Sequence, residues 1–132
     1  MNTDSKIIAN FLASIIWADG EFSGIERQCL HTLANDYEMP TLEADVENGL
    51  SEISSLQGSV LTERLVASAP QVNAEEKDAI LAFCLQLMGC DGYLAEEEIS
   101  NFYVIANVLG IGNERAQLLL SELTNDAEVL VD

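Results

Sequence analysis

Apolar residues recur along this chain at the spacing of helices rather than of strands. The clearest stripe covers residues 4–18, where apolar side chains return to one helical face at intervals of three or four positions. Six further stripes, bounded by glycine, proline or capping residues, predict helices at about 24–37, 42–53, 60–66, 73–90, 96–109 and 113–124. Runs that alternate between apolar and polar residues, typical of half-buried strands, are lacking. The pattern predicts an all-α fold of about seven helices, with a frayed tail after residue 125.

A shift of 72 residues, the distance from Asp19 to Asp91, places the first two predicted helices on the fifth and sixth. The identities that it brings together include Ile8 with Ile80, Phe11 with Phe83, Asp19-Gly20 with Asp91-Gly92, and Glu26 with Glu98. One offset therefore preserves the turn glycine, the acid spacing and the apolar stripe. We expect two related helix–turn–helix units, at about 4–39 and 74–111, joined by the third and fourth helices and related by a pseudo-twofold axis. The chain, 1–132, is then a single domain.

Each unit contains one copy of an acidic motif at the turn between its helices. The motif runs from Asp19 to Glu26 and from Asp91 to Glu98, and reads Asp-Gly, any residue, an apolar residue, three residues of any kind and Glu. This spacing matches the second half of a calcium-binding EF-hand loop. The positions that would supply the first-half ligands are Ile15 and Trp17 in one copy, and Leu87 and Gly89 in the other. An EF-hand is therefore excluded.

Two interpretations of the motif remain open. In the structural one, the glycines permit the tight turn, and Ser23 with Glu26 forms a capping box at the start of the next helix. Ala95 removes the capping hydroxyl from the second copy. In the functional one, four carboxylates converge on a divalent cation, with Ca²⁺ or Mg²⁺ favoured over Zn²⁺ because all the ligands are oxygens. The candidate ligands are Asp19, Glu26, Asp91 and Glu98.

The duplicated motif resembles that of the TerB-like family, which is associated with tellurite resistance. Residues 17–26 carry the resemblance best, and residues 89–98 form the second element. Related domains occur at the start of a membrane-anchored J-domain co-chaperone. The resemblance implies a seven-helix fold and a cytosolic domain in stress-response or membrane-associated assemblies, whose motif acids have been proposed to bind a divalent metal. It implies no catalytic activity. The chain departs from the family pattern at Cys90 and Ala95, where Ala and a polar capping residue are common.

Charge limits the classes of partner. The chain has 23 acidic residues against five Lys and Arg, and a formal net charge of −18. Nucleic acids and anionic membrane surfaces would be repelled, whereas a basic protein or peptide would be attracted. Solubility alone is the simpler account of this acidity. No segment has the length of a membrane span and the first residues lack a signal-peptide pattern, so we expect a cytoplasmic protein.

The residues that most often carry chemistry give no sign of catalysis. Cys29, Cys84 and Cys90 lack metal-ligand spacing, and we expect reduced, mostly buried thiols. His31 is the single histidine, and no nucleophile or nucleotide-binding motif is present. We expect Trp17 to lie in the core. The sequence predicts a non-enzymatic acidic module that binds a divalent cation, a protein partner, or both. The alternative is a purely structural interaction domain in which the motif acids only cap helices.

Overall fold

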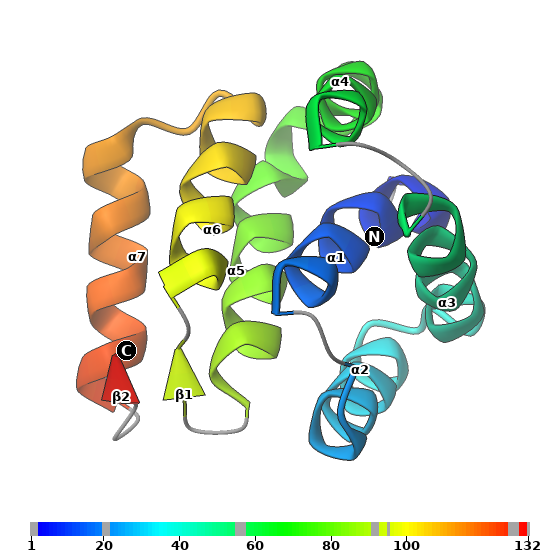
Figure 1. Cartoon of the computed structure of the whole chain (residues 1–132), viewed down its shortest axis with the longest axis horizontal. Helices are drawn as coiled ribbons and strands as arrows, with labels where there is room; N and C mark the ends of the chain where they lie inside the picture. Colours follow the sequence, from blue (N-terminus) through cyan, green and yellow to red (C-terminus); the bar gives the residue numbers. More distant parts are fainter. Residues whose placement is uncertain are drawn as a thin grey trace.

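The computed structural model describes residues 3–19, 22–54, 58–90, 93–94, 96–126 and 130–131, and only the backbone at 18, 19, 58, 59, 93, 94, 123–126, 130 and 131. Seven α-helices account for most of the described residues, as the apolar pattern predicts (Figure 1). They are α1 (Ser5–Asp19), α2 (Gly24–Asp36), α3 (Leu42–Ile53), α4 (Gly58–Ser68), α5 (Lys77–Gly89), α6 (Glu96–Val108) and α7 (Asn113–Asp126). Two 3₁₀ turns, η1 (Ala69–Gln71) and η2 (Ala74–Glu76), connect α4 to α5.

A pair of two-residue strands joins the second motif to the end of the chain. The strand β1 (Tyr93–Leu94) pairs in parallel with β2 (Leu130–Val131), with Tyr93 opposite Leu130 and Leu94 opposite Val131. The expectation of a frayed tail is therefore wrong at these two positions. Strands of two residues are too short to show an alternating pattern, so the sequence does not reveal this pairing.

The helix α1 lies at the centre of the molecule, packed against α3 on one side and against α5 and α6 on the other (Figure 1). Every side chain from Ile8 to Ile16 is buried except that of Asn10. Small residues permit this close packing: a Cβ atom placed on Gly49 of α3 would lie 3.3 Å from the Cβ of Ala13. The predicted single apolar stripe is thus too narrow, because neighbouring helices cover α1 on nearly all its faces.

Both halves of the chain contribute to one core. Phe11 of α1 and Phe83 of α5, the pair related by the 72-residue shift, are 0% and 1% exposed. Phe102 of α6 is also fully buried. The ring of Tyr37, at the end of α2, meets the ring of Phe83 edge-on, with 4.7 Å between the ring centroids. The first and second halves therefore bury their aromatic residues together rather than in separate cores.

The shift of 72 residues also relates the ends of helices. When 72 is added to the residue numbers that bound α2, the result is the bounds of α6. After α2, the backbone N–H of Met39 donates to the carbonyl of Ala34 over 2.8 Å. After α6, the N–H of Ile111 donates to the carbonyl of Ala106, also over 2.8 Å. Both helices therefore end in the same type of cap, in which a residue with left-handed backbone reverses the chain.

The two caps place different residues in the left-handed conformation: Glu38 has a φ of 53° and Gly110 a φ of 81°. A side chain in this region costs about 1–2 kcal/mol, whereas glycine adopts it freely. We therefore expect Glu38→Gly to raise the free energy of unfolding by up to about 1 kcal/mol in urea denaturation. As the matched control, Gly110→Ala should lower it by a similar amount, because an added Cβ meets no atom within 4 Å and only backbone strain counts. A loss of stability in Glu38→Gly would contradict this account.

Candidate functional site

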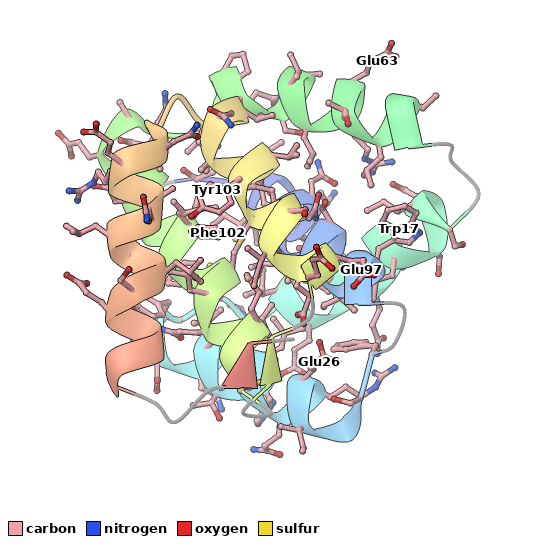
Figure 2. The ribbon with its side chains drawn as sticks, turned by 60° about the vertical axis from the view of Figure 1, so that its left-hand side comes forward. Trp17, Glu26, Glu63, Glu97, Phe102 and Tyr103 are labelled. Carbon is pink, nitrogen blue, oxygen red and sulfur yellow. The ribbon has the colours of Figure 1, made fainter. Side chains whose placement is uncertain are left out.

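The glutamates that close the two motifs are buried near the starts of α2 and α6. Glu26 and Glu98 are each 2% exposed, and Figure 2 shows Glu26 near the start of α2. No other acidic side chain that the structure describes is buried. A buried carboxylate loses its hydration and needs hydrogen bonds, an ion pair or a bound cation in return. The two equivalent positions therefore share an environment that sets them apart from the other described acids.

One role of Glu26 is a helix cap. The backbone N–H of Ser23 donates to Oε1 of Glu26 over 3.0 Å, and the N–H of Glu26 donates to Oγ of Ser23 over 3.1 Å. The predicted capping box at the start of α2 is thus confirmed. Ala95, at the equivalent position of the second motif, lies outside the described residues.

The structure describes the side chains of two of the four predicted metal ligands. Asp19 ends α1 with only its backbone described, and Asp91 lies outside the described residues, as do Gly20 and Gly92. Among the described side chains, no three or more of His, Cys, Asp and Glu form a group that could hold a metal. The full set of four ligands therefore stays a prediction. Its donor chemistry, carboxylate oxygen only, fits a hard cation such as Ca²⁺ or Mg²⁺.

Cys29, on α2, connects the first motif to the start of the second. Its thiol lies close enough to the side chain of Cys90, the residue before Asp91, and to Glu26 for both to affect its pKa. The side chain of Cys90 lowers the pKa of Cys29, against the opposing effects of burial and of Glu26. The thiol also donates to the backbone carbonyl of Gln86 over 3.5 Å. The first turns of α2 therefore pack against the end of α5, where the second motif begins.

An equivalent contact joins α6 to α1. Asn101 donates from Nδ2 to the backbone carbonyl of Ser14 over 2.9 Å and to its Oγ over 2.7 Å. The 72-residue shift relates Asn101 to Cys29, and Ser14 to Gln86. The second helix of each unit is thus bonded to the first helix of the other unit. Such an exchange of contacts is the pattern that a twofold axis generates.

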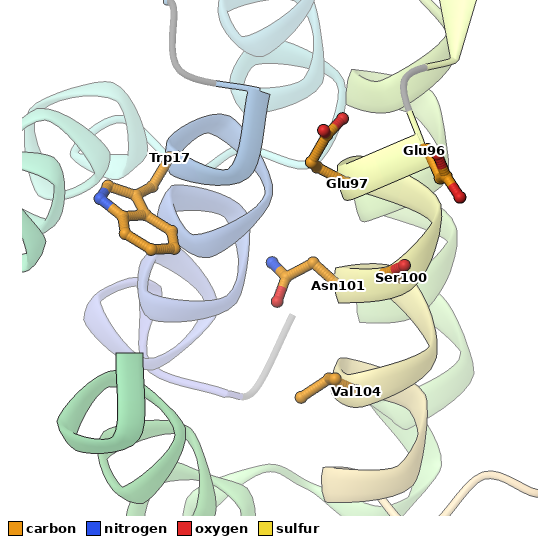
Figure 3. A pocket seen from close by; sticks show the side chains of 6 residues that line it. All are labelled: Trp17, Glu96, Glu97, Ser100, Asn101 and Val104. Carbon is orange, nitrogen blue, oxygen red and sulfur yellow. The ribbon is translucent and has the colours of Figure 1, made fainter. Parts of the chain in front are cut away.

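A surface groove of about 550 Å³ lies between α1 and α6 (Figure 3). Its lining residues are Trp17, Glu96, Glu97, Ser100, Asn101 and Val104. Trp17 is 40% exposed and Val104 is 38% exposed. The prediction that Trp17 lies in the core is therefore wrong. Other helices enclose α1 along most of its length, but Trp17 lies in its last turn, where this cover ends.

The shift of 72 residues relates this groove to a second one beside α2 and the end of α5. The second groove is lined by Gly24, Ile25, Gln28, Cys29, Thr32 and Cys90. Its chemistry differs, because Gly24 and the exposed Ile25 take the places of Glu96 and Glu97, and the half-buried Cys29 takes that of Asn101. The half-buried Cys90 has no counterpart among the residues that line the first groove. Mostly buried thiols were expected, but only Cys84 is fully buried, and burial raises its pKa to about 12.

The acidic outer face of α3 contacts basic side chains of α2 and α4. The contacts are Arg27 with Glu47 at 2.5 Å, His31 with Glu43 at 2.5 Å, and Arg64 with Glu52. Exposed pairs of this kind are worth about 1 kcal/mol or less. His31 therefore lies at the surface beside a carboxylate, and the acids of α3 are a solvated face with local partners.

Similarity does not assign the chain to a family. No family model, curated protein or solved structure matches it. The resemblance to the TerB-like family therefore stays a prediction that rests on the motif residues. None of the described helices combines the length and the apolar character needed to cross a bilayer.

Proposed function

We propose that this chain is a non-catalytic, acidic binding module of the TerB-like type, which holds a divalent cation at its two Asp-Gly turns. The burial of both motif glutamates, Glu26 and Glu98, supports this proposal more than any other observation. In a chain with 23 acids, these two lie at positions related by a single offset. Calcium and magnesium bind to several carboxylate oxygens, and burial of those oxygens strengthens the attraction. The stress-response role of the TerB-like family is the expected context.

We further infer that the two units are related by a pseudo-twofold axis, which brings the glutamate of each motif close to the aspartate of the other. The contact of Cys29 with both Glu26 and Cys90 favours this pairing, because Asp91 directly follows Cys90. Glu26 and Asp91 would hold the cation on one side, and Glu98 and Asp19 on the other. When bound, the cation would compensate the negative charge that the motifs concentrate at the turns.

The cation proposal is tested by the double variant Glu26→Gln/Glu98→Gln. Glutamine can still accept the capping hydrogen bond of α2, but it lacks the charge that a cation needs. We expect chelator-treated wild-type protein to bind Ca²⁺ or Mg²⁺ saturably in calorimetric titration. The double variant should bind at least about tenfold more weakly, because each charged hydrogen-bonding or ligand contact is worth about 1.5–3 kcal/mol.

The control for this experiment is Ser23→Ala, which removes the cap and keeps all four carboxylates. It should lower the free energy of unfolding by about 0.5–2 kcal/mol and leave cation binding unchanged. A wild-type protein without saturable binding would overturn the cation proposal, as would binding that survives in the double variant. Either result would favour the alternative, in which the motif acids only cap helices. The capping box observed in α2 is the observation in favour of that alternative.

A second candidate function is the binding of a basic peptide or protein segment in the groove between α1 and α6. The exposed Trp17 offers an aromatic surface, and Glu96 and Glu97 are exposed on the facing helix (Figure 3). Aromatic residues beside acids suit segments that combine Lys or Arg with apolar side chains. The net charge of −18 would attract such a segment over a distance.

This candidate predicts a fluorescence signal from Trp17, the single tryptophan of the chain. Titration with a peptide of alternating Lys and Leu should shift its emission to the blue and saturate, and added salt should weaken the binding. Glu97→Lys should weaken binding by about tenfold, whereas Glu63→Lys, the same change on the exposed face of α4 (Figure 2), should have little effect. Equal effects of both variants would indicate attraction to overall charge rather than binding in the groove.

A further inference from the structure

We propose that Cys29 and Cys90 form a reversible disulfide bond under mild oxidation, and that this bond links the two helical units. The two side chains line the same groove although they are far apart in the sequence. Their sulfur atoms also contact neighbouring peptide groups at the end of α5. The thiol of Cys29 donates to the carbonyl of Gln86 over 3.5 Å, and that of Cys90 to the carbonyl of Leu87 over 3.1 Å. The fold thus holds two thiols together before any oxidant is present.

The surroundings of the three cysteines make this pair selective. Cys29 and Cys90 are half-buried and line the groove beside α2, so a small oxidant can reach them. Cys84 is 0% exposed in the core and is shielded from the same oxidant. Reactivity of thiols depends on their access to solvent as well as on their ionisation. The structure therefore separates one accessible pair from one protected thiol.

The chemistry requires a two-electron oxidant, for which hydrogen peroxide is the simplest class. The sulfur of one thiolate attacks a peroxide oxygen, the O–O bond breaks, and the departing hydroxide takes up a proton to become water. The sulfur of the second cysteine then attacks the resulting sulfenic acid. The S–S bond forms, the S–O bond breaks, and the second oxygen leaves as water with the remaining protons. Overall, two thiols lose two electrons and two protons, and peroxide is reduced to two water molecules.

The bond would join α2 of the first unit to the residue after α5 of the second. Cys90 directly follows α5, so the disulfide would fix the end of α5 against the start of α2. The proposal stands on the contact between the thiols and does not depend on cation binding. We therefore assign this pair as a modification site for peroxides and for small disulfides, which exchange with thiols by the same attack on sulfur.

The test is peroxide treatment of the reduced, folded protein, followed by alkylation of the remaining thiols and mass spectrometry of the intact chain and its peptides. We expect the loss of two of the three thiols, a mass decrease of two hydrogens, and a cross-linked peptide that contains Cys29 and Cys90. Cys84 should become alkylated only after unfolding. A dithiol reductant should restore all the thiols. Cys29→Ser and Cys90→Ser should each abolish the cross-link, and both positions are exposed enough for serine to be accommodated.

The same treatment of urea-unfolded protein provides a matched comparison. Without the fold, Cys84 and Cys90 should pair most readily, because they are six residues apart and the cost of loop closure rises with loop length. The proposal would be supported if the unfolded protein forms mainly the Cys84–Cys90 disulfide and the folded protein forms the Cys29–Cys90 disulfide. Sulfinic acid on Cys29 with Cys90 still free would overturn it. So would cross-linked dimers in place of the intramolecular bond, or the same mixture of pairings in folded and unfolded protein.

Discussion

The Phe83→Ala variant should lose about 3–5 kcal/mol of unfolding free energy, and the loss should be detected in both halves of the molecule. Phe83 is 1% exposed on α5 and contacts Tyr37 of the first unit. The cavity left by its ring would therefore weaken the contact between the units as well as α5 itself. Urea unfolding measures this effect when it is followed both by Trp17 fluorescence, which reports on the first unit, and by far-ultraviolet circular dichroism, which reports on all helices.

The two signals should shift together to a lower urea concentration, because the units share one core and unfold cooperatively. Phe11→Ala, the equivalent change in the first unit, is the matched variant and should cause a loss of the same size, since Phe11 is 0% exposed. A Phe83→Ala protein whose Trp17 signal keeps its wild-type midpoint would contradict the shared core. The units would then unfold independently.

Oxidation of the Cys29–Cys90 pair should raise the free energy of unfolding by about 4 kcal/mol. The estimate follows from the entropy that a cross-link removes from the unfolded chain when it closes a ring of about 60 residues. In the folded state the two thiols already donate to adjacent carbonyls at the end of α5, so we expect little rearrangement to offset this gain. The measurement is urea unfolding of the oxidised and reduced proteins, with oxidation verified by the absence of free Cys29 and Cys90.

Cys29→Ser, treated with peroxide in the same way, should show no gain and so controls for other oxidative changes. A lower stability of the oxidised protein would contradict the view that the fold holds the two sulfurs in position for bonding. In that case the bond would form only at the expense of the contact between α2 and α5.

The parts of this fold that local chemistry determines were predictable from the sequence. Ser23 and Glu26 form the predicted capping box, because both partners lie within one turn of the same helix. The helix α6 ends before Gly110, in line with the glycine boundaries of the apolar stripes, because glycine adopts the left-handed conformation freely. The seven helices have bounds within a few residues of those that the apolar stripes indicate.

Features that depend on neighbours from elsewhere in the chain were not predictable. Trp17 continues a helix that is buried almost throughout, and only the positions of the surrounding helices expose it. The contact between Cys29 and Cys90 is similar, because the 72-residue repeat relates equivalent residues within the units but does not specify which residues meet between them. The pairing of β1 with β2 likewise rests on two residues in each strand. Two of the four proposed ligands, Glu26 and Glu98, are buried. Nothing in the sequence around them, apart from the motif itself, indicates this burial.

The second helix of each unit is hydrogen-bonded to the first helix of the other unit, α2 to α5 and α6 to α1. This exchange of contacts bears on how such a protein could arise. A chain with a single unit would leave exposed the face of α1 that α6 covers here, and a second copy of the same short chain would be able to cover it. Two such copies would meet only at sufficient concentration. The segment that contains α3 and α4 joins the copies covalently, so that each helix finds its partner at any dilution. In these terms, the 72-residue repeat is the pattern that duplication and fusion of one half of a dimer would leave in a chain.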